Sequence, residues 1–454
     1  MRRFAFIGRM GVLDMAAVSI VQPDAVPVEV QFVNTFSRLD YGIGDALEKL
    51  RTLGLCPSET AVDLLILAAL INAADTRVSR ARNAQNGWTR ELDLTVPVSN
   101  VALWRSQSDL LERTLRFLTG DHWRIFFRER PPGFGALAQV PTVMALTGFD
   151  EVCLFSGGLD SLIGAIDLFD RGRRPLLVSH YWDSETSKAQ QALLYQLGKK
   201  MAPREVYALR TRLGFDKNHV DTGEIEETQR GRSFLFFALA TLAASSLAGT
   251  IQVIVPENGL IGLNVPLDPL RLGALSTRTT HPFYMARINE LIANLDIPVT
   301  LVNPYRHMTK GEMVVACKDL PFLRQVVASS MSCSSPAKAR YKRMSPRHCG
   351  TCVPCLIRRA SLTPSLGIVD PTLYAVPSLN DHTLDTRSAE GEHVRSFQLM
   401  VDKLAAAPHL ADALVWLPGP LGDAPSELAD YVGVFRRGMA EVGGLLKKVK
   451  AKPA

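Results

Sequence analysis

The stretch VCLFSGGLDSLIGA, residues 152–165, decides the fold. Its first four residues are apolar, as in a buried strand, and an apolar run with helical spacing follows the segment from Ser156 to Ser161. Two adjacent glycines, Gly157 and Gly158, permit a tight turn and a close approach of the backbone to a ligand. Amide groups of such a turn and of a helix start form a cradle for an anion. We therefore predict a strand–turn–helix unit that binds phosphate groups. A glycine turn without a ligand is the alternative.

Short apolar strands and helices alternate around this stretch, from about residue 150 to about residue 365. The expected strands are 151–155, 175–182, 205–209, 251–258 and 298–305, and the expected helices are 160–170, 185–201, 231–248 and 282–294. This alternation predicts an α/β fold with a parallel sheet that helices cover on both faces. Ligands of such sheets bind at the carboxyl ends of the strands, where the glycine turn lies.

Two further regions flank this core. Residues 1–149 mix strand-like runs with helical stretches, which predicts an N-terminal α+β domain whose role the sequence does not show. The expected strands there are 26–33, 91–98 and 123–130, and the expected helices lie near 58–83 and 103–118. Residues 366–454 predict a helical C-terminal extension, and its basic end, KKVKAKPA, is interpreted as a solvated terminus.

Composition narrows the class of protein. The chain has 454 residues, of which 47% are hydrophobic and 21% charged, so it can bury a large core. A net charge of +6 suits an anionic ligand and is too weak to indicate nucleic acid. The longest apolar stretches, 61–74 and 234–249, are shorter than the roughly 20 residues that cross a membrane. Arg9 and Asp14 interrupt any signal-peptide core. We therefore expect a cytoplasmic protein without a membrane partner.

The cysteines predict a metal centre. Four of the seven cysteines, Cys333, Cys349, Cys352 and Cys355, lie close together in the sequence, and the last three have CxxCxxC spacing. Four thiolates complete a tetrahedral Zn²⁺ site and leave no position for a reacting water, so the predicted zinc is structural. Four reduced cysteines without a metal, or an iron–sulfur cluster, are the alternatives.

The segment SGGLDS resembles the SGGxDS signature of the PP-loop ATP pyrophosphatases, which have an adenine nucleotide alpha hydrolase-like fold. Together with the cysteine pattern and the Arg pair that follows it, this makes residues 150–365 similar to the QueC family of 7-cyano-7-deazaguanine synthases. Weaker similarities occur in between, in QRGRSFLFFALA (229–240), PENG (256–259), STRTTHPFYMARI (276–288) and NPYRHMTKGEMV (303–314). The long flanking regions, and THP in place of the usual Pro-Asp, look more like the QueC-like proteins of antiphage operons, such as the QatC group of the Qat system.

The resemblance implies ATP and Mg²⁺ as cofactors and an ATP-dependent C–N ligase activity. A 7-deazaguanine-type carboxylate would be adenylated with release of pyrophosphate, and an amine would then take the acyl group to give an amide, or a nitrile after a second activation. The implied cofactor-binding residues are Ser156, Gly157, Gly158, Leu159, Asp160, Ser161 and Arg230, and the implied catalytic residues are Asp160, Ser161, Arg232 and Lys310. Asp160 is expected to hold the pyrophosphate through Mg²⁺ or to cap the helix.

Several alternatives stay open on the sequence alone. Surface salt bridges would equally explain the basic residues Arg230, Arg232 and Lys310. His180 and His281 are interpreted as core or surface histidines. A tRNA-modifying PP-loop enzyme is one alternative function, although the four clustered cysteines are assigned to metal and the modest charge argues against an RNA partner. A non-catalytic nucleotide-binding subunit of a defence complex is another, with other proteins of the operon as partners.

Overall fold

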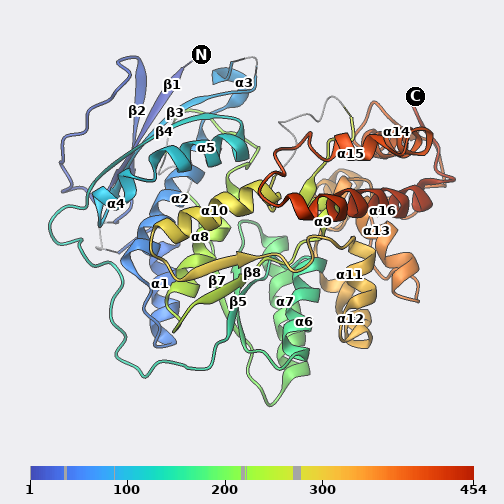
Figure 1. The fold of residues 1–454 in the computed structure, drawn as a ribbon, viewed down its shortest axis with the longest axis horizontal. Helices are drawn as coiled ribbons and strands as arrows, with labels where there is room; N and C mark the ends of the chain where they lie inside the picture. The colour runs from blue at the N-terminus through green and yellow to red at the C-terminus, as the bar shows by residue number, and fades with distance from the viewer. Residues whose placement is uncertain are drawn as a thin grey trace.

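The computed structural model describes residues 2–34, 38–85, 87–215, 220, 222–268 and 278–453. These residues form two larger parallel β-sheets, with helices packed around them, and one small two-stranded sheet (Figure 1). One sheet has five strands in the order β7-β6-β5-β8-β9, and the other has four strands in the order β2-β1-β3-β4. The α/β class with a parallel-sheet core is therefore confirmed.

The five-stranded sheet comes from the region around the glycine turn. Its strands are β5 (Glu151–Leu154), β6 (Pro175–His180), β7 (Tyr207–Thr211), β8 (Ile251–Ile254) and β9 (Val299–Val302). Each neighbouring pair is parallel. The chain runs outward from β5 to β7 and then returns to the other side of β5 with β8 and β9. The strand order thus reverses between β5 and β8, which is where open α/β sheets bind ligands.

Helices cover both faces of this sheet because successive strand residues point to opposite sides. Val152 and Leu154 join the apolar cluster that includes α8 and α10, whereas Cys153 joins the cluster of α6, α7, α11 and α12. The bounds of these helices are α6 (Leu159–Asp170), α7 (Ser184–Met201), α8 (Arg232–Ser245), α10 (Pro282–Asn294), α11 (Lys310–Ala316) and α12 (Leu320–Val326). The expected strands and helices of residues 150–305 are therefore present, with small shifts at their ends.

The N-terminal region differs from the expectation. Its strands are β1 (Arg3–Arg9), β2 (Ala25–Gln31), β3 (Glu91–Val98) and β4 (His122–Glu129), and all three pairings are parallel. Its helices are α1 (Ile43–Thr52), α2 (Glu59–Arg77), α3 (Arg80–Asn83), α4 (Val101–Arg105) and α5 (Ser108–Thr119). Helical crossovers between β2 and β3 and between β3 and β4 keep the strands parallel. The predicted α+β arrangement is therefore wrong, and this region is α/β.

Helix α2 joins the two sheets. It is apolar over most of its circumference, as in a helix that is buried on all sides. Its residues share one apolar cluster with strands of both sheets and with α8, against which it packs. The described parts of residues 1–301 therefore contribute to a continuous core, and the expected domain boundary near residue 149 stays a prediction.

The C-terminal region is helical, as expected. A second apolar cluster combines its helices with α9 and α13. The helices of the C-terminal region are α14 (Glu392–Ala406), α15 (Leu410–Leu414) and α16 (Leu428–Leu446), whereas α9 (Gly259–Leu263) and α13 (Val353–Ser365) precede it. Short 3₁₀ helices also occur, namely η2 (Val327–Ser329), η3 (Pro336–Lys342) and η4 (Pro425–Glu427). Within the described ranges, no helix is both long and apolar enough for a membrane crossing.

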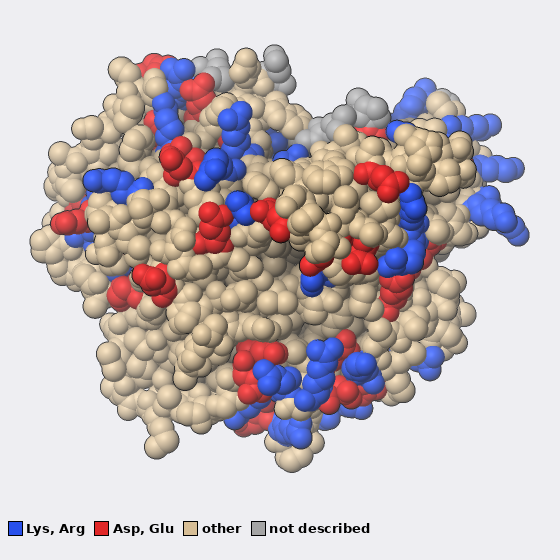
Figure 2. Space-filling model, in the orientation of Figure 1, with Lys and Arg blue, Asp and Glu red and all other residues tan. Residues whose placement is uncertain are grey.

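The basic end of the chain is tied to the fold. Strand β11 (Ala451–Lys452) pairs in parallel with β10 (Leu384–Asp385), so the end is not only a solvated tail. Lys and Arg side chains gather on this part of the visible face, whereas charges of both signs are mixed over the rest of it (Figure 2).

Candidate functional site

The glycine turn connects β5 to α6 at the point where the strand order reverses. Gly157 has φ +84°, and a Cβ atom there would lie 3.0 Å from Cγ of Gln190, so both conformation and space favour glycine. The Ser156 hydroxyl accepts from the Gly158 amide at 3.3 Å, and its oxygen lies 3.2 Å from the Ser161 hydroxyl oxygen. The predicted strand–turn–helix unit is therefore present, and the hydroxyls of its two serines lie side by side.

The start of α6 adds amide groups to this turn. The first hydrogen bond of the helix runs from the Leu162 amide to the Gly158 carbonyl oxygen, at 3.1 Å. Amides earlier in the first turn have no partner within a helix. The Leu159 amide donates to the Ser332 hydroxyl at 3.4 Å, which leaves the amides of Asp160 and Ser161 for an anion. This geometry can cradle a phosphate group.

Asp160 is the centre of a buried polar cluster beside the turn. Its Oδ2 accepts from the backbone amide of Asn258 at 3.1 Å and from the Asn258 side-chain amide at 2.7 Å. Its Oδ1 accepts from Nζ of Lys310 in an ion pair. The structure therefore brings together Asp160 and Lys310, which the sequence analysis placed in one site. Both carboxylate oxygens are already engaged, which favours a positioning role over direct coordination of Mg²⁺.

Lys310 is the first residue of α11, and a capping box holds the start of this helix in place. Thr309 caps this helix by accepting from the Glu312 amide at 3.1 Å, and Glu312 returns the bond by accepting from the Thr309 amide at 2.8 Å. Only 5% of Lys310 is exposed. The capping box therefore fixes the origin of the lysine side chain, and Asp160 fixes its end.

The C-terminal helix α16 supports the same helix start. Glu441 accepts from the Thr309 hydroxyl and, at 3.4 Å, from the Gly311 amide. A Cβ atom on Gly311 would lie 2.6 Å from Oε1 of Glu441, so glycine allows this approach. Arg437 of α16 donates to Glu312 at 2.6 Å. The C-terminal region is thus in direct contact with the element that carries Lys310.

Glu257 is a further carboxyl group in this cluster, and the sequence analysis gave it no role. It precedes Asn258 and accepts from the Thr280 hydroxyl. Burial raises its pKa to about 7, and the nearby charge of Asp160 acts in the same direction. An acidic residue three positions after the end of β8, where the carboxyl ends of the parallel strands lie, was the signal that could have identified it. Glu257 can therefore exchange a proton near neutral pH.

Arg230 lies at the junction with the N-terminal region. It donates to the carbonyl oxygen of Thr119 at 2.8 Å, and its guanidinium lies 5.3 Å from the centre of the Trp88 ring. Burial lowers its pKa to about 10. These contacts give Arg230 a structural partner on the N-terminal side, and they lend no support to its predicted role in nucleotide binding.

Arg232 and the two histidines lie at other positions around the sheet. Arg232 is the first residue of α8, and burial lowers its pKa. Its charge lies close enough to His180 to contribute to the lowered pKa of that histidine. Burial also lowers the pKa of His180 and of His281 to about 3. His180 accepts from the Leu213 amide at 3.3 Å, and His281 accepts from the Phe283 amide at 3.2 Å. Both are neutral histidines of the interior. Residues 276 and 277, the first two of the segment STRTTHPFYMARI singled out by the sequence analysis, lie outside the described residues.

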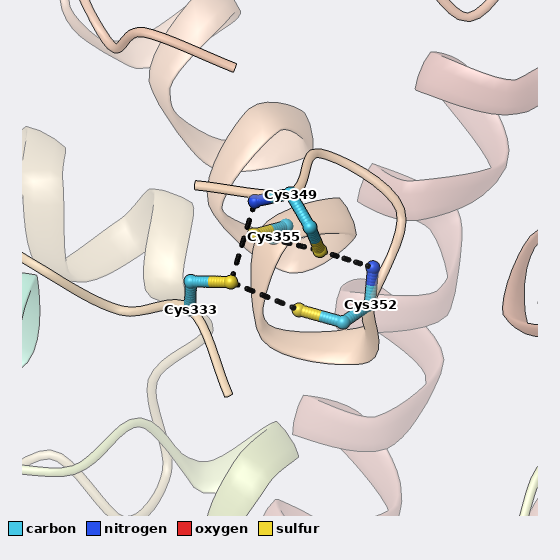
Figure 3. A group of neighbouring side chains, drawn as sticks. All are labelled: Cys333, Cys349, Cys352 and Cys355. Atoms are coloured by element: carbon cyan, nitrogen blue, oxygen red, sulfur yellow. Dashed lines mark hydrogen bonds between the residues drawn. The ribbon is translucent and has the colours of Figure 1, made fainter. Parts of the chain in front are cut away.

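The four cysteines form a second candidate site (Figure 3). All four Sγ atoms lie within 4.8 Å of one another, with Cys333 and Cys352 at 4.0 Å and Cys349 and Cys355 at 3.8 Å. A tetrahedron with metal–sulfur bonds of about 2.3 Å has sulfur–sulfur edges of about 3.8 Å. The four cysteines could therefore hold a metal ion such as zinc.

Backbone amides support these sulfur atoms. The Cys349 amide donates to Sγ of Cys333 at 3.3 Å, and the Cys352 amide donates to Sγ of Cys349 at 3.3 Å. Gly350, with φ +93°, makes the turn between these cysteines possible. Hydrogen bonds among the four thiols lower the pKa of Cys349 and of Cys352, the latter to about 7, and raise the pKa of Cys333 and of Cys355. The four sulfur atoms therefore share protons, and a metal that binds all four as thiolates has to displace those that remain.

Comparison with known proteins supplies no further guide. No family model matches this sequence, and no curated protein matches it. The function of the chain has to be inferred from the geometry of the glycine turn, the Asp160–Lys310 pair and the cysteine centre.

Proposed function

We propose that this protein is an ATP-dependent ligase of the PP-loop type, which adenylates a carboxylate and releases pyrophosphate. One observation carries the proposal: the buried Asp160–Lys310 pair lies beside a glycine turn at the reversal of strand order. A cation held beside an amide cradle suits a triphosphate, because both stabilise negative charge.

The residues have distinct roles in this proposal. Amides of the turn and of the first turn of α6 bind the β- and γ-phosphates, together with the hydroxyls of Ser156 and Ser161. Lys310 neutralises charge on the α-phosphate, and Asp160 positions Lys310. Mg²⁺ accompanies ATP as the counter-ion of its phosphates, and Asp160 need not bind it because its oxygens accept other hydrogen bonds.

The reaction has two steps. An oxygen of the carboxylate attacks the α-phosphorus, the bond to the β-phosphate breaks, and pyrophosphate leaves. An amine nitrogen then attacks the acyl carbon, AMP leaves, and the amine gives up a proton. Glu257, with its pKa of about 7, is the group of the cluster that can take this proton.

The similarity to the QueC family suggests the substrate. We propose a 7-deazaguanine-type carboxylate, an amide or nitrile as product, and a cytoplasmic role in antiphage defence alongside other operon proteins. We also propose that the metal of the cysteine centre is a structural Zn²⁺, since four thiolates leave no open position.

The test is a product assay with the purified chain, ATP, Mg²⁺ and a 7-deazaguanine carboxylate, with and without ammonia. AMP and pyrophosphate in equal amounts, formed only with the carboxylate, support the proposal. ADP and phosphate as products would contradict it. ATP binding without any turnover would favour a non-catalytic nucleotide-binding subunit instead.

A further inference from the structure

The segment 330–332, between η2 and Cys333, lies directly against the glycine turn. The Met331 amide donates to the Gly157 carbonyl oxygen at 2.8 Å. The Leu159 amide lies 3.4 Å from the hydroxyl oxygen of Ser332, which it reaches as a donor. A Cβ atom on Gly158 would lie 3.6 Å from the Met331 carbonyl oxygen. Three consecutive residues of the turn and helix start therefore face this segment.

The opposite side of the same segment is fixed by the cysteine centre. Ser332 precedes Cys333, and its amide donates to Nε2 of His348, which precedes Cys349, at 3.1 Å. Arg358, on the helix that carries Cys355, donates to the Ser332 hydroxyl at 3.2 Å. Ser332, the neighbour of Cys333, therefore links His348, the neighbour of Cys349, to the amide of Leu159.

Arg358 strengthens this link because it is fully buried. It also donates to the hydroxyl of Ser330 at 2.9 Å and to the carbonyl oxygen of Val327 at 2.8 Å. A buried guanidinium with several acceptors holds them in one arrangement. The segment that touches the glycine turn is thus anchored at both ends, by Arg358 and by the cysteine centre.

We propose that loading the cysteine centre with metal orders the glycine turn through Ser332 and thereby sets the affinity for the phosphates of ATP. A metal ion joins Cys333 to the cysteines of the loop and helix start at 349–355, and so restricts the segment that ends at Cys333. Ser332 acts as a positioning residue. The part of this inference that concerns ATP rests on the proposed function.

Hydrogen exchange of the full chain tests the coupling without any nucleotide. We compare protein loaded with Zn²⁺ with protein stripped by a chelator, and follow the peptide that covers residues 152–165. Faster exchange of this peptide in the stripped protein, with unchanged exchange in α2, is the expected result. Equal exchange of this peptide in both forms overturns the inference.

A variant covers the case in which the stripped protein loses its fold. In the Zn²⁺-loaded chain, Ser332→Ala should leave the metal content at one ion per chain, speed exchange of the turn, and weaken ATP binding about three- to tenfold, as for one lost hydrogen bond. Ser332→Thr, which keeps the hydroxyl, should restore binding. Ser334→Ala is the matched control, because the described hydrogen bonds include none from its hydroxyl.

The outcomes separate the two proposals. Unchanged exchange and unchanged ATP affinity in Ser332→Ala overturn the coupling, whatever the activity of the protein. Failure of the loaded, unsubstituted chain to bind ATP contradicts the proposed function, while its exchange data still decide whether the metal orders the turn.

Discussion

Replacing Lys310 by Met tests the centre of the proposed site. The side chains of Lys310 and Asp160 are 6% and 12% exposed, so their ion pair is almost free of solvent. Removing one partner of a buried pair costs about 3–5 kcal/mol, because the other charge is left without compensation. Asp160 keeps two hydrogen bonds from Asn258, so we expect a loss near the lower limit, about 3 kcal/mol.

The same substitution should affect the reaction more than the binding of ATP. Loss of a cation at the α-phosphate removes charge stabilisation in the transition state, for which about 10²–10³-fold in kcat is typical. Release of pyrophosphate under saturating ATP measures this loss, and urea unfolding followed by circular dichroism measures the stability.

A double-mutant cycle shows whether the two residues act as a pair. Asp160→Asn removes the charge that Lys310→Met leaves unpaired, so the double variant should recover about 1–2 kcal/mol relative to the sum of the single losses. If the two losses simply add, the side chains do not interact in solution, and the assignment of Asp160 as the positioning residue of Lys310 is wrong.

Three other substitutions test neighbouring features. Glu257→Gln should remove the limb of the pH–rate profile near pH 7, where activity of the unsubstituted enzyme rises as the carboxyl loses its proton. Because its folded pKa lies above the usual value, Glu257 should also make the protein less stable as the pH rises from about 4.5 to 7, and urea midpoints across this range should lose that trend in the Gln variant. Cys352→Ser should lower bound zinc below one ion per chain by elemental analysis and reduce stability; full metal content in a stable variant would contradict the four-cysteine site. Gly157→Ala should weaken ATP binding by calorimetry more than tenfold. Gly172→Ala is its control, since Gly172 has a similar φ of +74° but no atom within 4 Å of an added Cβ, and an equal effect of both substitutions would show that only backbone strain matters.

The sheet around the glycine turn could be predicted because its strands are continuous apolar runs between helices of ordinary length. Strand β1 was not predicted, because a short apolar run near the amino end, RFAFIGR, carries no alternation that separates a strand from other apolar segments. Without β1, the parallel character of the N-terminal sheet could not be recognised.

The glycine turn, the four cysteines and Lys310 were predictable from the sequence, whereas other contacts of the site were not. The contact between Asp160 and Asn258 depends on β8 lying beside β5, which strand order alone decides. Arg230 shows the converse, since the sequence assigned it to nucleotide binding, whereas the predicted role of Arg232 stays a prediction. The fold directs Arg230 to Thr119, on a strand–helix unit that the sequence analysis assigned to a separate domain.

The contact of α16 with the start of α11 shows that the C-terminal region is needed to hold Lys310 in its observed place. Glu441 satisfies Thr309 and Gly311, which flank Lys310, and burial raises the pKa of this glutamate. A chain truncated after residue 365 would keep the whole predicted PP-loop core, 150–365, and still leave this helix start open to water. Without these contacts, the first turn of α11 should fray, and Lys310 would lose its fixed position. A shortened chain, for crystallography or for assays, should therefore keep all residues up to the end of α16.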